Sequence, residues 1–459
     1  MNPTVPLRPP NERPPGPPGH PIHGSLWEFH EDPVGFQVRT ARAYGDVSRF
    51  RFFHMPAYLA VHPDDVRTIL VDPDGAFVKG MAMEGFRPLV GKGLLLNEGE
   101  SHRRQRRMMQ PAFHRRRVAG YGAVMLEEAR RLADRWEDGA RVDMDVEMNR
   151  LTLTIAARTL FGTGVTDAEA RDVADAMTAF TRWYHQSTHP MGPLLQMIPT
   201  EATRSFKEAK RALGAVVDRM IRARREGGDT GDILSMLVFA RDAEGDGAAM
   251  SDEHVHDEAI TLLVAGHETT GATLAWAWSL LDAHPDIAAK LRAEIDAVCG
   301  DREPTVEDVP RLTYAEMVFA ETLRLYPSAT ALPRQAVKPV VLGGYTVPAG
   351  ALVMAGAWCC HRDPRFWDEP EAFRPERWTP EAKAARPKFA YIPFGGGART
   401  CIGEAFAWME GTLVLATLAR RWSASVAPGH VVVPEALFTV RPKGGLPMVV
   451  TRRCTTPAR

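Results

Sequence analysis

The segment from Ser251 to His284 is the longest stretch of the chain that can form a single helix. Ser251 and Asp252 supply N-cap chemistry, the acidic residues of the first turns suit the positive end of the helix dipole, and Pro285 ends the segment. Apolar side chains occur on nearly all of its sides, which is the pattern of a helix surrounded by protein. We therefore predict that this helix runs through the centre of the molecule.

The rest of the chain divides into a short strand-rich part, a long helical part and a second strand-rich part. The pattern predicts strands over 47–53 and 57–61, separated by a turn at Met55-Pro56. It is mostly helical from about 95 to 327, with one helix over 315–325. Short antiparallel strands are expected over 340–342, 345–347 and 351–354, and a hairpin, broken at 444–445, over 431–450. An amphipathic helix is expected to begin near Cys401.

The domain organisation follows from these patterns. Residues 1–21 contain nine prolines, which gives an extended arm that is either a poorly ordered tail or a stiff spacer fixing the start of the fold. Residues 22–459 show no internal repeat and no low-complexity linker. The fold class expected is mainly α with small antiparallel β-sheets, in a single large domain.

Charge and cysteine content narrow the possible classes of protein. The 459 residues include 56 Lys and Arg against 57 Asp and Glu, a formal net charge of −1, which argues against nucleic-acid binding. Five cysteines without a regular framework are typical of a reducing compartment. No secretory leader and no apolar run of membrane-spanning length are visible. We expect a cytoplasmic protein without a transmembrane anchor.

The stretch from Phe394 to Gly403 reads F-G-G-G-A-R-T-C-I-G and places Cys401 at a helix N-terminus after a glycine-rich turn. The helix dipole and free backbone N–H groups lower the pKa of a thiol in that position. Glycines allow a large flat group to approach the backbone, and Arg399 offers a cation to an anionic substituent. The residues alone are compatible with a redox-active cysteine, a phosphate-binding nest or an iron ligand. The ten-residue pattern is too specific for a buried inert cysteine.

This stretch resembles the haem-binding signature of the cytochrome P-450 family, F-x-x-G-x-R-x-C-x-G, through Phe394, Gly397, Arg399, Cys401 and Gly403. The resemblance extends from about 14 to 447. It implies that Cys401 is the axial thiolate ligand of a non-covalent protohaem (haem b), and that Phe394 and Arg399 belong to the cofactor site. A thiolate ligand favours O–O cleavage, on which oxygenation of C–H bonds depends.

Two further matches are read as structural. Glu321-Thr322-Leu323-Arg324 matches the family's E-x-x-R, in which the two charged side chains meet at i and i+3 on one helix. Taken in isolation, this spacing would also suit a surface ion pair. Phe373 to Trp378 resembles the family's P-E-R-F element, with Trp378 in place of Phe. The resemblance implies that Arg377 completes a network with Glu321 and Arg324.

The central helix carries Ala265-Gly266-His267-Glu268-Thr269-Thr270, which resembles the family's [AG]-G-x-[DE]-T-[ST]. The resemblance implies that Thr269 hydrogen-bonds oxygen species at the iron and that Glu268 relays protons from solvent, which makes these two the catalytic residues. A zinc motif H-E-x-x-H is excluded because Gly271 stands where the second His belongs. A core or capping role is the ordinary alternative for a threonine within a helix.

A basic run, S-H-R-R-Q-R-R from Ser101 to Arg107, lies in the N-terminal half of the chain. Such a run is usually a solvated face. Alignment with the family implies that His102 and Arg106 bind the haem propionates, and that Arg334, beyond the E-x-x-R helix, provides a further cation. The remaining arginines, among them Arg103, Arg104 and Arg107, are candidates for docking an acidic electron donor.

The resemblance implies a haem-thiolate monooxygenase that inserts one oxygen atom from O2 into a lipophilic substrate, namely a fatty acid, a terpenoid or a carotenoid-like molecule. No flavin or nicotinamide domain is visible, so a separate ferredoxin or flavodoxin-type protein with its reductase is expected to supply electrons. A peroxide-driven peroxygenase and a non-catalytic haem-binding sensor are the alternatives. The expected pocket is apolar, although any helical core gives such a set, and it includes Leu262, Ala265, Ala331, Leu332 and Thr439.

Overall fold

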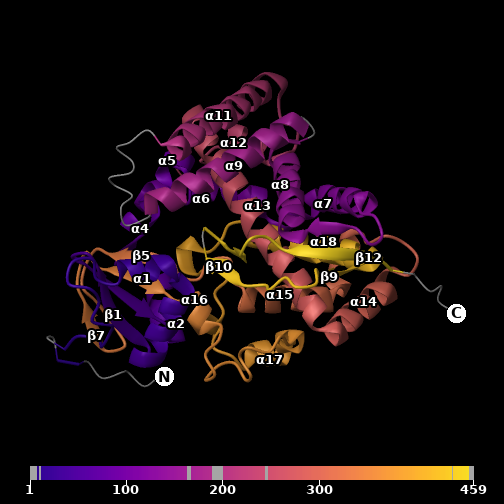
Figure 1. Cartoon of the computed structure of the whole chain (residues 1–459). Helices are drawn as coiled ribbons and strands as arrows, with labels where there is room; N and C mark the ends of the chain where they lie inside the picture. The colour runs from indigo at the N-terminus through magenta and orange to yellow at the C-terminus, as the bar shows by residue number, and fades with distance from the viewer. Residues whose placement is uncertain are drawn as a thin grey trace.

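The computed structural model describes residues 8–9, 12–162, 167–188, 200–242, 245, 247–436 and 438–453. Helices dominate the chain, as predicted (Figure 1). The α-helices are α1 (Leu26–Glu31), α2 (Pro33–Tyr44), α3 (Pro63–Val71), α4 (Met81–Glu84), α5 (Arg87–Val90), α6 (Gly99–Met109), α7 (Arg115–Arg135), α8 (Met144–Phe161), α9 (Asp167–Thr188), α11 (Glu201–Gly227), α12 (Ile233–Phe239), α13 (Asp252–Ala283), α14 (Pro285–Cys299), α15 (Thr313–Leu325), α16 (Ala357–Cys360), α17 (Pro380–Ala384) and α18 (Glu404–Arg421).

The strands form small sheets. They are β1 (Val47–Phe52), β2 (Met55–Ala60), β3 (Phe77–Val78), β4 (Arg141–Asp143), β5 (Leu332–Ala336), β6 (Val340–Leu342), β7 (Tyr345–Val347), β8 (Leu352–Ala355), β9 (Trp422–Val426), β10 (Pro434–Ala436), β11 (Val440–Pro442) and β12 (Pro447–Arg452). In the described part of the chain, the largest sheet has the order β1-β2-β8-β5-β3, and two smaller pairs, β6-β7 and β10-β11, lie outside it. A three-stranded sheet has the order β4-β12-β9.

Three local predictions about the strands were wrong. The first turn lies at Phe53-His54 rather than at Met55-Pro56, because Met55 already pairs with Phe52 and Phe53 adopts a positive φ of 51°. Strand β8 does not extend the β6-β7 hairpin: it pairs in parallel with β2 and antiparallel with β5. The C-terminal hairpin is β10-β11, whereas β12 joins β9 and β4. For β8 and β12 the partners β2 and β4 are distant in sequence, and local patterns do not contain them.

Helix α13 occupies the centre of the molecule, as predicted, with α8, α15 and α18 packed around it (Figure 1). Its N-cap is Ser251, whose hydroxyl accepts the His254 N–H at 3.3 Å. The proline-rich stretch contacts strand β1, because the Arg49 N–H donates to Pro15 O at 2.9 Å. A side chain on Gly16 would collide with Arg49 O, so a glycine is required for this close approach.

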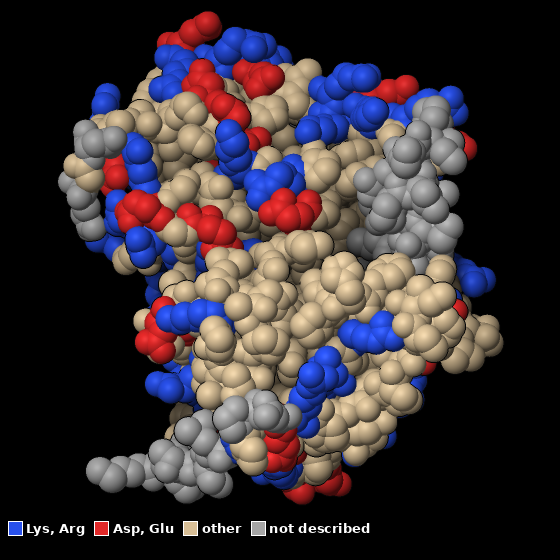
Figure 2. All heavy atoms as spheres, turned by 90° about the vertical axis from the view of Figure 1, so that its left-hand side faces the viewer, with Lys and Arg blue, Asp and Glu red and all other residues tan. Residues whose placement is uncertain are grey.

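Charged side chains are unevenly distributed over the face that carries the N-terminal sheet. Figure 2 shows blue and red side chains intermixed over the upper, helical part, whereas the lower part is mostly uncharged. The exposed apolar side chains of the chain include Ile22, Phe53 and Val341, which belong to this sheet region. Among the described helices, none is long and apolar enough to cross a membrane.

Candidate active site

The loop before α18 positions Cys401. Cys401 N–H donates to Phe394 O at 2.9 Å, which closes the loop, and α18 begins three residues later at Glu404. Gly397 has a φ of +65°, and a Cβ there would lie 2.2 Å from Leu70 O. Only glycine combines this conformation with so close a contact. The glycine-rich sequence therefore fixes where the thiol is presented.

The Cys401 side chain keeps exposed surface at the end of the glycine-rich loop. Burial by the surrounding protein nevertheless raises the pKa of its thiol, an effect opposed by the Gly403 N–H and by Arg106. The sequence predicted a lowered pKa from the helix N-terminus, but desolvation outweighs that effect in the chain by itself. Ala265 is likewise exposed, in the middle of the otherwise buried helix α13.

The two predicted catalytic residues of α13, Thr269 and Glu268, lie in different environments. Thr269 is half-buried and its hydroxyl donates to Ala265 O at 2.9 Å. Glu268 is almost fully buried, and its Oε1 accepts a hydrogen bond from Thr439 Oγ1 at 3.0 Å. Thr439, expected in the substrate pocket, is thus placed at Glu268 and is itself buried. Successive positions on a helix point about 100° apart, which explains why the two side chains diverge.

The cations expected at the cofactor come together in the structure. Repulsion from Arg399, Arg106 and Lys79 adds to burial in lowering the pKa of His102 to about 4. Burial, followed by Arg399, lowers the pKa of Arg334 to about 10. Arg399 donates to Asn97 O at 2.5 Å and pairs with Glu98. Arg106 donates to Thr400 O at 2.8 Å.

Lys79 and Glu98 belong to this group but were missed from the sequence. Burial, together with Arg334 and Arg399, lowers the pKa of Lys79 to about 7. Glu98 Oε1 accepts a hydrogen bond from the backbone N–H of Lys79 at 2.5 Å. Lys79 lies just after β3, 22 residues before the basic run, so no local motif marks it. Only the pairing of β3 with β5, which brings Lys79 close to Arg334, identifies Lys79 as a member of this group.

The residues present fit a haem. The exposed thiol of Cys401 supplies one soft ligand of the kind that iron accepts. Ala265, small and exposed, leaves free surface on the central helix. Within the described part of the chain, the cluster of Lys79, His102, Arg106, Arg334 and Arg399 has one ion-pair partner, Glu98. The arginines give this cluster an excess of positive charge that is partly removed from water, which is unfavourable by itself and suits a group with two carboxylates, as the propionates of protohaem provide.

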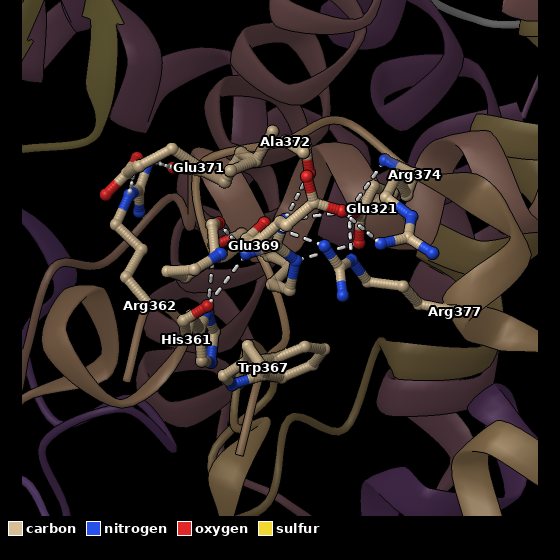
Figure 3. Close-up of polar contacts among 12 residues, drawn as sticks. Glu321, His361, Arg362, Trp367, Glu369, Glu371, Ala372, Arg374 and Arg377 are labelled. Carbon is tan, nitrogen blue, oxygen red and sulfur yellow. Dashed lines mark hydrogen bonds and ion pairs between the residues drawn. The ribbon is translucent and has the colours of Figure 1, made fainter. Parts of the chain in front are cut away.

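The predicted Glu321–Arg324 network is present and fully buried (Figure 3). Arg324 Nε and Nη2 donate to the two Glu321 oxygens at 2.8 and 2.7 Å. Arg377 Nε lies 3.3 Å from Glu321 Oε1. Both side chains of the pair have 0% exposed surface, so the charges are compensated within the protein rather than by water.

The rest of this network ties distant backbone segments together. The free Arg324 donors reach three backbone carbonyls, namely His361 O at 2.9 Å, Pro370 O at 2.5 Å and Ala372 O at 2.9 Å. Trp378 Nε1 donates to Glu321 Oε2 at 2.9 Å. The tryptophan found where the family pattern has Phe therefore adds a hydrogen bond that Phe cannot make. The network holds the segment that leads to the Cys401 loop.

The remaining predicted residues lie as follows. Arg103 pairs with Glu100 at 2.7 Å, and Arg104 and Arg107 lie 3.3 and 3.2 Å from the buried Asp242, so these three arginines are engaged within the chain. Leu262 is half-buried on α13. Ala331 and Leu332 are partly buried beside the core of the N-terminal sheet. Leu332 also lies near the Cys401 loop, 3.7 Å from where a Cβ on Gly395 would be.

A cysteine after a glycine-rich turn, a cluster of basic side chains and an acid–alcohol pair on a central helix are the features expected of a haem-thiolate protein. The chain belongs to the cytochrome P-450 family, whose model, described as Cytochrome P-450, matches residues 14–446. Members of this family are oxidoreductases that bind haem, use a redox partner and act on lipophilic substrates, and this chain is a monooxygenase of that kind.

Individual relatives agree with this assignment. The chain is 38% identical over 435 residues to cyclooctat-9-en-7-ol 5-monooxygenase of Streptomyces melanosporofaciens, with 94% of each chain covered. It is 35% identical over 423 residues to pentalenene oxygenase of Streptomyces avermitilis, covering 92% of this chain and 93% of the relative. The crystal structure of the cytochrome P-450DA haem domain matches with a TM-score of 0.85 at 28% identity, covering 96% and 98% of the two chains.

Proposed function

We propose that this monooxygenase hydroxylates a terpenoid, with haem b as its cofactor and with electrons from a separate ferredoxin or flavodoxin-type protein. Fatty acids and carotenoid-like molecules are also lipophilic and are the alternative substrates. The observation that carries the proposal is that Cys401, Ala265 and Thr269 keep accessible surface although the protein around them is buried. We also propose a cytoplasmic location, since Cys299, Cys359, Cys360 and Cys401 are free thiols.

The names of two relatives support a terpenoid, because they describe oxygenases of cyclooctat-9-en-7-ol and of pentalenene. An apolar polycyclic molecule gains about 25 cal/mol per Å² of apolar surface that it buries in a protein pocket.

In the mechanism, each side chain has a distinct role. Bound haem would supply the oxygen-activating chemistry. Arg106, Arg334 and Arg399 would bind and orient its carboxylates, and Cys401 would provide the thiolate ligand. Thr269 holds a proton at its hydroxyl, and Glu268 replenishes that proton, because a positioned acid accelerates steps that consume protons.

The acid–alcohol pair favours O2 over peroxide as the oxidant, because a peroxide-driven reaction needs no such proton relay. It also disfavours a haem sensor, which needs no proton delivery. The conservative variant Thr269→Val should therefore lower the product formed per electron pair consumed while retaining peroxide-driven turnover. An equal loss with both oxidants would favour the peroxygenase.

The electron donor is proposed to dock on α6 and the start of α7. Arg103 on α6 and Arg115, Arg116 and Arg117 at the start of α7 are exposed basic residues. Charge reversal of Arg115 and Arg116 should raise the KM for an acidic ferredoxin and weaken its dependence on salt. Unchanged kinetics in this variant would reject the docking surface.

The substrate proposal is tested by optical titration. Cyclic terpenes, terpene alcohols, fatty acids and small hydrophilic compounds are added in turn to the haem-loaded protein. Displacement of water by a substrate should shift the Soret band to shorter wavelength, and the largest shift is expected with cyclic terpenes or their alcohols. A shift caused only by hydrophilic compounds would reject the lipophilic substrate.

A further inference from the structure

A surface hollow of about 200 Å³ is lined by α17, by the segments on either side of it and by α18. Helix α17 lies at the lower edge of the molecule in Figure 1. None of the residues that line the hollow belongs to the cation cluster or to α13. Pockets for drug-sized ligands measure about 300–1,000 Å³, so this hollow suits a ligand of one or two rings. Its walls are aromatic and basic, and include Trp378, Lys383, Arg386, Lys388, Tyr391 and Trp408.

The aromatic walls direct their polar atoms into the protein. Trp378 Nε1 donates to Glu321 Oε2 at 2.9 Å, and the Tyr391 hydroxyl donates to Ala320 O at 3.0 Å. Tyr391 and Trp408 are half-buried, so each keeps part of its ring surface accessible. These side chains therefore offer mainly ring carbon to the hollow, which favours a flat apolar group as ligand.

The guanidinium of Arg386 lies on aromatic faces at the same hollow. Its central carbon is 4.0 Å from the ring centroid of Trp367 and 4.8 Å from that of Trp378. Its Nη2 donates to Arg377 O at 3.3 Å, and within the described residues this is its one hydrogen bond. Contact with the two rings fixes the plane of the guanidinium, while most of its five donors remain available to a ligand.

Arg386 differs from the neighbouring arginines in its lack of an anion. Arg374 pairs with Glu369 at 2.7 Å, and Arg377 Nε lies 3.3 Å from Glu321 Oε1. In the part of the chain that the structure describes, Arg386 has no such carboxylate. Burial lowers the pKa of Arg386 to about 10, so the side chain stays protonated at neutral pH. It has lost part of its hydration without gaining a counter-charge, which an anionic ligand would supply.

The other cations of the hollow add to this positive charge. Lys388 is exposed, and Lys383 Nζ lies 3.8 Å from Glu316 Oε1. Of the three cations in the lining, only Lys383 has an ion-pair partner among the described residues. The carboxylate of Glu404 accepts Trp408 Nε1 at 3.5 Å. An anion at Arg386 and Lys388 would therefore not compete with a carboxylate already paired to them.

We propose that this hollow binds a small aromatic carboxylate, with its rings against Tyr391 and Trp408 and its carboxylate on Arg386 and Lys388. The planar fork of donors on arginine matches the two oxygens of a carboxylate, and the aromatic walls match the rings. The proposal goes beyond the oxygenation of a terpenoid and does not depend on it, because no residue of the hollow belongs to the cofactor site.

The test is a calorimetric titration of the haem-loaded protein with a phenylimidazole bound to its iron, so that the space beside the iron is filled. Three probes are compared: naphthoate, the neutral naphthalenemethanol with the same rings, and cyclohexanecarboxylate with the same charge but no aromatic ring. Naphthoate should bind one to one and about tenfold more tightly than either of the others. No binding of naphthoate, or equal affinity for naphthoate and naphthalenemethanol, would overturn the proposal.

Two variants locate the binding. Arg386→Gln should weaken the binding of naphthoate about tenfold, because it removes a charge-assisted contact, and should leave naphthalenemethanol unaffected. Lys388→Glu changes an exposed side chain, so it is expected to fold normally, and should also weaken binding of naphthoate. Unchanged affinity in Lys388→Glu, or in a folded Arg386→Gln, would refute the assignment of the carboxylate to these cations.

The matched control is Lys207→Glu, which makes the same change of charge at an exposed position of α11, at the upper edge of the molecule in Figure 1. Its titration should coincide with that of the unaltered protein. An equal loss of affinity in this control would attribute binding to overall charge and overturn the proposal. If naphthoate fails to bind while Lys388→Glu raises the KM for a ferredoxin, the hollow contacts a protein partner and the small-ligand proposal is wrong.

Discussion

Replacing Arg324 by alanine is expected to destabilise the protein by about 5 kcal/mol. Arg324 and Glu321 are both fully buried, and removing one partner of a buried pair costs about 3–5 kcal/mol. Three carbonyls that Arg324 satisfies lose their donor, at about 1 kcal/mol each. The contacts that Arg377 and Trp378 make with Glu321 remain and offset part of this loss. The result is comparable to the whole stability of many domains, about 5–15 kcal/mol.

The assay is urea unfolding of the haem-loaded protein, followed by far-UV circular dichroism and by the Soret band. Arg225→Ala, which removes an exposed pair, is the control and should change stability by about 0–1 kcal/mol. The double variant Glu321→Gln/Arg324→Met leaves no unpaired carboxylate and should be more stable than Arg324→Ala. A loss below about 1 kcal/mol for Arg324→Ala, or a double variant less stable than the single one, would refute this reasoning.

Three further outcomes are expected. Cys401→Ala should abolish the thiolate-type Soret band of the reduced carbon monoxide adduct, and a retained band would contradict its role as ligand. Trp378→Phe should lower the free energy of unfolding by about 1.5–3 kcal/mol, because it removes a hydrogen bond to the buried Glu321 carboxylate, and urea unfolding that shows no loss would argue against that bond. Since the folded protein lowers the pKa of Lys79 from 10.5 to about 7, the unfolded chain binds more protons between these values, and the haem-free protein should gain stability as pH rises through that window. Lys79→Met should flatten this slope in denaturation measured from pH 6 to 10, and a persistent slope would locate its origin elsewhere.

The sequence predicted those features whose physical cause is local. The length of α13 and its cap at Ser251 follow from periodicity and capping chemistry, and both are found. The meeting of Glu321 with Arg324 follows from i, i+3 spacing on a helix. The family assignment and the mainly helical fold rest on motifs that are contiguous in the chain, and the comparisons confirm both.

What surrounds these features could not be predicted, because it depends on residues far apart in the chain. Strand β8 was expected beside its sequence neighbours, yet it pairs with β2, almost 300 positions earlier. Lys79 and Glu98 join the cation cluster without any motif of their own. The pKa of Lys79 depends on burial, which exists only once the elements have packed.

The two residues of the catalytic motif show the same division. The sequence by itself determined that Glu268 and Thr269 are adjacent on a central helix, since both identity and periodicity are local properties. Only the tertiary structure decided that the Glu268 carboxylate is buried against Thr439 and Arg441, whereas Thr269 keeps accessible surface. The partner Asp145 is 296 positions from Arg441, and such a contact is set by how α8, α13 and β11 pack together rather than by the propensity of any one segment.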